Sequence, residues 1–505
     1  MNDRTRRALV LMLAGLALGV VGEVLRTRVP ARLDAMLWIA TFLFIALALV
    51  RAGVLTTPPH GRWLGAAAWI LVPCLAWRDT SALFALDLLG LAGLLVLVAP
   101  ATRLRSLGRI GGVDLVRGGA SLAGATFAGA LPAVVRDIQW ADIPLSAPMR
   151  RLSGVAAGLT AATPVLLVFG ALLGEADPLF RRSLSWIWSF DLGGVGKHLA
   201  FVGVTSWLAA GLLRGVFWWE DIGRVATPAG RGRVAPAAVV SFVGAVGVLL
   251  LAFVLFQARE LFLDAGEFQR LLGTTIAVYA RRGFFELVWV ATLTLPLLLG
   301  ADWLLSRNDP RAVRRFRSLT AGVLVLLTLI LASALHRMLL YAAFYGLTED
   351  RFYTLAFMLW LGGICGWYAV TVLRGRRSSF VPGALFAAYA VLMALHVVNP
   401  DATVARVNLR RAAGGATLDT AYLARLSADA VPAILREAAT LGSADRCAMW
   451  EALDRRWDSD LRHDDGGAVW NLSRREARRQ FQAAASTAPI CPANGPVPQG
   501  TDARL

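Results

Sequence analysis

Ionisable side chains inside otherwise apolar stretches are the residues of this sequence best placed to do chemistry. The stretch 318–345 contains His336 and Arg337 before its end, and Tyr341 and Tyr345 follow Arg337 by four and eight positions. This spacing puts the cation and both hydroxyls on one face of a helix. If lipid surrounds the stretch, these groups line a polar cavity, because a charge at the membrane centre costs at least about 2.5–3.5 kcal/mol. The alternative is an arginine that snorkels to the membrane interface beside the tyrosines.

A second group of polar residues surrounds the start of another apolar stretch. Arg281 and Arg282 precede this stretch, and Glu286 lies in its first turn. Guanidinium groups bind phosphate and carboxylate through paired hydrogen bonds, so these arginines are candidates for holding an anionic substrate. Glu286 could equally neutralise one of them. Asp177, at the end of a third apolar stretch, joins Glu286 and His336 as a candidate for proton transfer.

The elements that must position these residues are apolar segments of membrane-spanning length. Hydrophobic residues make up 57% of the 505 residues and charged residues 17%, with a mean hydropathy of +0.59, whereas soluble domains are about 25% charged. A single soluble core does not grow beyond a domain of about 250–300 residues, so the excess apolar surface requires lipid. A span needs about 20 residues, and eleven candidates lie near 8–25, 33–50, 63–77, 82–99, 152–173, 198–218, 234–256, 284–305, 318–345, 352–373 and 380–398.

The predicted fold is therefore an all-α polytopic transmembrane helix bundle of about eleven spans, with ten and twelve also open, and a small helical C-terminal tail domain. One segment, Gly118–Val135, is uncharged but rich in Gly and Ala and contains Pro132. We expect it to be interfacial or re-entrant; if it crosses the membrane, the four upstream spans reverse their orientation.

The chain divides into five regions by composition. They are an N-terminal group of four spans (1–100), an Arg-rich connection (101–151), a transmembrane core (152–400), a polar helical tail (401–486) and a disordered C-terminus (487–505).

The net charge is +17, and most arginines of the first 380 residues lie in short connections between the spans. Alternate connections are poorer in arginine, except for Arg26, Arg28 and Arg32 after the first span. Arginines crowd the N-terminus and the connections after spans four, six, eight and ten. The positive-inside rule then places the N-terminus in the cytoplasm and, after eleven spans, the tail outside the cytoplasm. The candidate site residues all fall on the extracytoplasmic side. Because topology accounts for the basic charge, we expect contacts with membrane lipids and none with nucleic acid.

Few motifs add to this interpretation. Nucleotide-binding, zinc-protease and hydrolase signatures are missing from the sequence, so we expect neither a cofactor nor a metal. Glycine pairs such as Gly15/Gly19 and Gly211/Gly215 indicate close helix packing. Cys447 and Cys491 in the tail have two open outcomes, a disulfide in an oxidising compartment or two unrelated thiols.

Four stretches of the sequence carry a family resemblance. They are 168–181 (VFGALLGEADPLFR), 279–289 (YARRGFFELVW), 335–363 (LHRMLLYAAFYGLTEDRFYTLAFMLWLGG), and 399–412 (NPDATVARVNLRRA) continued by 418–434 (LDTAYLARLSADAVPAI). Together they resemble the bacterial multi-pass membrane proteins grouped as domain of unknown function 4173, near the related 4153 group. The resemblance covers about residues 150–440 and implies a polytopic protein of the bacterial inner membrane, without implying an activity.

Three functions fit the sequence, and whether the protein is an enzyme stays open. The first is binding or processing of an anionic lipid or lipid-linked substrate at the extracytoplasmic face, with Arg281, Arg282, Arg337, Tyr341 and Tyr345 holding the substrate. The second is ion- or proton-coupled transport. The third is a non-catalytic envelope scaffold or sensor that meets an envelope protein partner through its tail.

Overall fold

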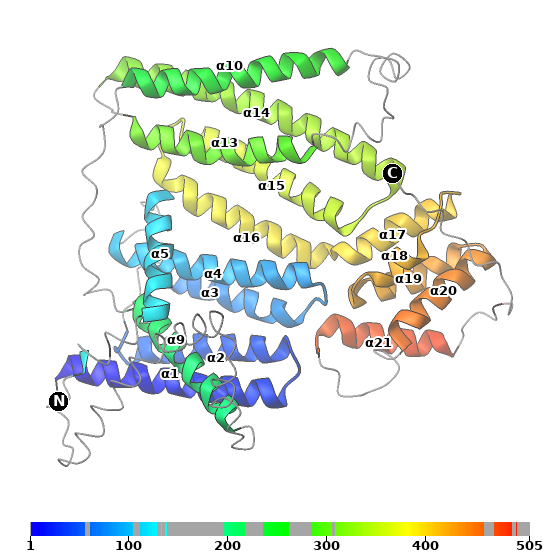
Figure 1. Ribbon diagram of the computed structural model, residues 1–505, viewed down its shortest axis with the longest axis horizontal. Coiled ribbons are helices and arrows are strands. Elements are labelled where there is room, and N and C mark those ends of the chain that lie inside the picture. Colours follow the sequence, from blue (N-terminus) through cyan, green and yellow to red (C-terminus); the bar gives the residue numbers. More distant parts are fainter. Residues whose placement is uncertain are drawn as a thin grey trace, which may run out of the picture. The chain divides into compact units, whose positions relative to one another are not determined.

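A computed structural model gives the arrangement of the chain (Figure 1). It describes residues 2–55, 61–104, 112–128, 133, 137–138, 195–217, 236–261, 284–305, 309–458, 469–486 and 491. All regular elements among these residues are helices, as the sequence predicts.

Nine of the described helices are long and apolar enough to cross a membrane. They are α1 (Asp3–Arg28), α2 (Leu33–Arg51), α4 (Ser81–Leu104), α9 (Val195–Phe217), α10 (Pro236–Leu261), α13 (Phe284–Leu304), α14 (Pro310–Tyr345), α15 (Glu349–Thr371) and α16 (Phe380–Val398). Each matches one of the eleven predicted spans, so the polytopic helical fold is confirmed.

The two remaining predicted spans are not found as long apolar helices among the described residues. The segment 63–77 forms a short helix, α3 (Gly61–Leu71), which continues as the 3₁₀-helix η1 (Val72–Ala76). The segment 152–173 lies outside the described residues. Part of the segment expected to be interfacial or re-entrant forms α5 (Gly112–Ala128), a helix of 17 residues.

The described residues divide into two compact units, one comprising 1–75 and 88–225 and the other 76–87 and 226–505. In the first unit, α1 packs closely on α9 through its glycines. A Cβ at Gly15 would lie 2.8 Å from the carbonyl oxygen of Ser206, and one at Gly19 would lie 2.6 Å from that of Val202. Gly211 makes a similar approach to α5, where a Cβ would lie 2.7 Å from a backbone oxygen. The packing role predicted for these glycine pairs is confirmed.

The second unit contains five long helices, α10, α13, α14, α15 and α16 (Figure 1). Their buried side chains form one apolar core. Leu327, Ile330 and Ala334 of α14 are fully buried in this core, as is Tyr368 of α15. α14 has 36 residues, which corresponds to about 54 Å at 1.5 Å per residue. Because the hydrocarbon layer is only about 30 Å thick, α14 extends beyond it.

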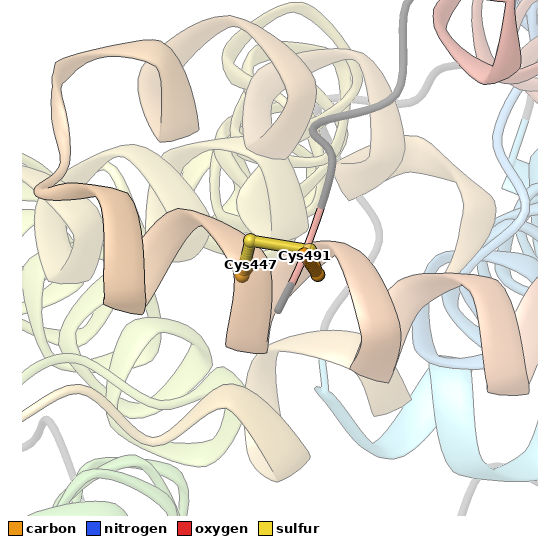
Figure 2. The surroundings of a disulfide bond; sticks show 2 residues. All are labelled: Cys447 and Cys491. Atoms are coloured by element: carbon orange, nitrogen blue, oxygen red, sulfur yellow. A yellow bond between two sulfur atoms is a disulfide. The ribbon is translucent and has the colours of Figure 1, made fainter. Parts of the chain in front are cut away.

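The tail forms a small helical domain with its own core, here called the tail domain (residues 400–491). Its helices are α17 (Pro400–Ala413), α18 (Thr420–Arg425), α19 (Val431–Glu437), α20 (Ser443–Trp457) and α21 (Leu472–Ala485). Trp457 and Phe481 are almost completely buried in its centre. A disulfide joins Cys447 of α20 to Cys491, with the two Cα atoms 5.6 Å apart (Figure 2). Of the two outcomes open for these cysteines, the structure has the disulfide.

Candidate functional site

Two buried aspartates join the connection before α4 to the tail domain by reciprocal hydrogen bonds. The carboxylate of Asp429 accepts hydrogen bonds from the backbone amides of Asp79 (2.6 Å) and Thr80 (3.1 Å). The carboxylate of Asp79 accepts one from the backbone amide of Ala428 at 3.0 Å. Amides at a helix N-terminus have no partner within the helix, so a carboxylate there satisfies donors and favourably meets the helix dipole. Asp429 does this for α4.

Asp79 also holds the start of α21. Its Oδ1 atom accepts hydrogen bonds from Asn471 Nδ2 (2.7 Å) and Arg474 Nε (3.3 Å). The backbone amide of Ser473 donates to the carbonyl oxygen of Trp77 at 3.0 Å. Asp79 is 7% exposed and Asn471 is fully buried. A buried carboxylate is tolerated only with such a set of donors, so the contact is fixed in geometry.

Arg78 links the same connection to the end of α16. Its Nε donates to the carbonyl oxygen of His396 at 2.9 Å, and its Nη1 lies 3.5 Å from Asp429 Oδ1. The guanidinium carbon stands 5.0 Å from the ring centroid of Trp77. The last turn of a helix carries carbonyl oxygens without intrahelical partners, and Arg78 satisfies one of them while neutralising Asp429.

His396 and Asp87 form a fully buried pair between α16 and α4. His396 Nε2 lies 2.8 Å from Asp87 Oδ1, and neither residue has exposed surface. The indole of Trp77 stacks on the imidazole with ring centroids 5.6 Å apart. Among the described residues, His396 Nδ1 has no hydrogen-bond partner. Ionisable residues inside spans are costly and are often functional, so this pair is a candidate for holding or passing a proton.

A third buried carboxylate, Asp401, lies at the start of α17. It accepts a hydrogen bond from the backbone amide of Ser427 at 3.2 Å and another from the Ser427 hydroxyl. Burial, followed by the neighbouring charge of Glu349, raises the pKa of Asp401 from 3.8 to about 7. Asp401 therefore changes its charge near neutral pH.

The connection between α14 and α15 also contacts the tail domain. The side chain of Asn408 donates to the carbonyl oxygen of Leu347 (2.6 Å) and accepts from its backbone amide (2.9 Å). The amide of Glu349 donates to the hydroxyl of Tyr422 at 2.9 Å. Gly346 has φ +81°, a conformation that favours glycine. Two connections and the end of α16 thus meet the tail domain at one end of the second unit.

Four of the predicted site residues lie in α14. His336 is exposed and Arg337 is half-buried. The rings of Tyr341 and Tyr345 lie 5.1 Å apart. A cation does meet the tyrosines, because the guanidinium carbon of Arg351 stands 4.1 Å from the Tyr341 ring centroid.

The other predicted site residues are not tested. Asp177, Arg281 and Arg282 lie outside the described residues. Glu286 belongs to α13, but its side chain is not described. The roles assigned to the whole set stay predictions.

Sequence reasoning missed Arg78, Asp79, Asp87 and Asp429. Asp87 had a usable signal, because it is the only charged residue within the predicted span 82–99. Asp79 had none, because it is a single acidic residue between two helices. Asp429 lies within the family-like stretch 418–434, but nothing there indicates its partner, since the hydrogen bond joins positions 350 residues apart. Within the described parts of the chain, no group of three His, Cys, Asp or Glu residues could hold a metal ion.

The nine apolar helices among the described residues, with a tail domain fastened to their connections, define a polytopic integral membrane protein. The family model named Domain of unknown function (DUF4153) matches residues 65–437, and the chain belongs to this family. The motifs had suggested the 4173 group, with 4153 as a related one; the matching model is that of 4153. No curated protein and no solved structure matches the chain.

Proposed function

We propose that this protein is an inner-membrane scaffold that holds its tail domain in a fixed orientation at the extracytoplasmic face for an envelope protein partner. The observation that carries the proposal is the reciprocal pair of contacts between Asp79 and Asp429. A flexible tether would serve if the tail domain only had to stay near the membrane. Buried carboxylates with several donors each fix both position and angle.

The junction between α16 and α17 supports rigidity. Asn399 is the only residue between the two helices; its φ of 55° is left-handed, and its side chain accepts a hydrogen bond from Ala402 at 3.1 Å. Pro400 starts α17, where its missing N–H costs nothing. The turn between the helices is therefore tightly specified. The disulfide supports the extracytoplasmic location, because disulfides persist in oxidising compartments.

Proton-coupled transport is a second candidate, and the buried pair of His396 and Asp87 favours it. Ionisable residues inside spans are rare and costly, and they often mark proton or ion pathways. Transport requires protonation of the pair to change during the cycle, whereas a scaffold requires only its shape.

Binding of an anionic lipid or lipid-linked substrate at the extracytoplasmic face is the third candidate. Its support among the described residues is the group formed by Tyr341, Tyr345 and Arg351 near the end of α14. Arg351 adds a second cation to the one at Arg337. A phosphate requires such donors at hydrogen-bonding distance.

One complementation experiment separates the three functions. A strain lacking the gene receives wild type, Asp429→Ala, the paired change Asp87→Asn with His396→Gln, or the paired change Arg337→Gln with Arg351→Gln. The scaffold predicts that only Asp429→Ala loses function, because the other variants leave the contacts between Asp79 and Asp429 in place. Loss with the Asp87 and His396 pair supports transport, and loss with the arginine pair supports anion binding; either result, with Asp429→Ala active, would overturn the scaffold.

The scaffold also predicts a partner contact that depends on docking. A photo-crosslinking amino acid at exposed Arg436 should give a discrete adduct in wild-type cells. Asp429→Ala should abolish this adduct. Asp419→Ala is the matched control, since Asp419 caps α18 through the amide of Tyr422 at 2.9 Å and makes no contact with the connection before α4. Equal adducts in wild type and Asp429→Ala would show that docking does not matter to the partner.

A further inference from the structure

The end of the second unit opposite the tail domain contains an exposed group of arginines. The first turns of α14 contribute Arg311, Arg314 and Arg315, all exposed. α14 is longer than the hydrocarbon layer is thick, and these arginines precede its long uncharged run, so they lie where the hydrocarbon ends. The spacing from Arg311 to Arg314 and Arg315 puts all three on one side of the helix.

The connection between α15 and α16 brings further arginines to the same place. A Cβ at Gly375 would lie 3.3 Å from Arg317 Nη2, so the guanidinium of Arg317 rests against this connection. Arg374 and Arg376 flank Gly375 and are exposed. Two elements distant in sequence therefore present their guanidinium groups together.

Two described acidic residues lie near this cluster, and each has a partner. Asp302 of α13 forms an ion pair at 2.6 Å with Arg377, which lies in the connection between α15 and α16. Asp309 caps α14, because its side chain accepts a hydrogen bond from the amide of Arg311 at 2.8 Å. The ion pairs recorded among the described residues include none of the other six arginines, namely Arg311, Arg314, Arg315, Arg317, Arg374 and Arg376. Their donors are available to an external anion.

We propose that this arginine cluster (Arg311, Arg314, Arg315, Arg317, Arg374 and Arg376) binds the phosphate of an anionic phospholipid headgroup. Guanidinium groups match phosphate oxygens through paired, charge-assisted hydrogen bonds. Basic pockets between the ends of spans are suited to anionic headgroups. Arg-rich span connections lie on the cytoplasmic side by the positive-inside rule, which makes the inner leaflet the source of the lipid.

An apolar surface beside the cluster favours a lipid over a free phosphate. Leu319 follows Arg315 by four positions, so it lies on the same face of α14, and it is 37% exposed. Further along α14, Val325 is 60% exposed and Leu329 is 51% exposed. An acyl chain lying against this helix would bury apolar surface while its phosphate stays at the arginines. A free phosphate anion would gain only the contact with the arginines.

The test uses the full-length protein in nanodiscs of neutral phosphatidylcholine, titrated with phosphatidylglycerol. Bound lipid is counted by native mass spectrometry, and the thermal midpoint is followed in parallel. The variant combines Arg314→Gln, Arg315→Gln and Arg317→Gln. The matched control combines Arg425→Gln, Arg436→Gln and Arg475→Gln, which removes three exposed charges from the tail domain. A third variant combines Arg314→Lys, Arg315→Lys and Arg317→Lys, which keeps the charge but not the paired hydrogen bonds.

We expect the cluster variant to bind phosphatidylglycerol about 100-fold more weakly than wild type, which is about 3 kcal/mol and corresponds to about 1 kcal/mol per arginine. The control should match wild type, and the Lys variant should lie between them. Equal retention of the lipid by wild type and the Gln variant would overturn the proposal. Saturation of the thermal shift by inorganic phosphate alone would overturn the assignment to a lipid.

Discussion

Replacing Asp429 by alanine should loosen the tail domain from the connection before α4. Asp429 is 3% exposed. Its carboxylate accepts hydrogen bonds from the backbone amides of Asp79 and Thr80, and its Oδ1 atom lies 3.5 Å from Nη1 of Arg78. Alanine leaves these donors buried without their acceptor.

The magnitude follows from what is left behind. Each buried donor without a partner costs about 1–3 kcal/mol, and breaking a buried ion pair by removing one partner costs about 3–5 kcal/mol. These costs overlap because the same groups relax together, so we expect Asp429→Ala to make docking of the tail domain less favourable by about 3–5 kcal/mol. At about 1.4 kcal/mol for each tenfold change, the opened state becomes roughly 10² to 4 × 10³ times more populated.

Hydrogen exchange measured by mass spectrometry in nanodiscs reads this population directly. Peptides covering 77–86 and 425–433 should exchange faster in Asp429→Ala, while peptides from α10 and α13 should not change. Asp419→Ala is the control, since it removes an exposed cap of α18 at a cost of about 1 kcal/mol. Unchanged exchange at 77–86 would refute the idea that this aspartate fastens the tail domain.

Three further predictions test other parts of the structure. The pKa of Asp401 is raised from 3.8 to about 7 in the folded state, so its contribution to stability is full below about pH 4 and falls as the pH rises to about 7. Above about pH 7 the contribution is constant. Asp401→Asn should remove this fall of the thermal midpoint with pH. Gly15→Ala should lower the thermal midpoint by forcing α1 and α9 apart, whereas Gly203→Ala, with nothing within 4 Å, should not. Reducing the bond between Cys447 and Cys491, which are separated by 44 residues, should destabilise the tail domain by roughly 4 kcal/mol, as measured by proteolysis. An impermeant thiol reagent should then label both cysteines in intact spheroplasts; labelling only after lysis would contradict the extracytoplasmic location.

Much of the fold could be predicted because lipid imposes a simple rule on the sequence. Every backbone group inside the hydrocarbon must be satisfied locally, so an apolar run of sufficient length becomes a helix. The run 234–256 carries no charge and corresponds to α10 (Pro236–Leu261). The run 63–77 fails the same rule, because Pro73 removes a backbone donor and the chain tightens into a 3₁₀-helix there.

The contacts of the tail domain could not be predicted in the same way. Asp79 lies in a connection of four residues, and Asp429 follows Ser427 in a short turn; neither has spacing that indicates a partner. Their pairing depends on which ends of which helices meet, and this is decided by the packing of the whole bundle. Local rules still explain each half of the contact, since a free helix N-terminus and a carboxylate each require the other.

The same contacts limit how the chain crosses the membrane. The connections 77–80 and 346–348 both meet the tail domain, so they lie on one side of the membrane, and an even number of crossings must separate them. Five described spans lie between them, namely α4, α9, α10, α13 and α14.

One further crossing is therefore needed, and the sequence offers two candidates, Gly118–Val135 and the segment 152–173, the second of which lies outside the described residues. We predict that only one of the two crosses. Single cysteines at positions 105 and 145, labelled from outside the cell, should react on opposite sides if Gly118–Val135 crosses and on the same side if 152–173 does. In either case, position 80 should have the sidedness of position 347. If positions 80 and 347 labelled from opposite sides, the docking of both connections on one tail domain would be wrong, and the scaffold proposal with it.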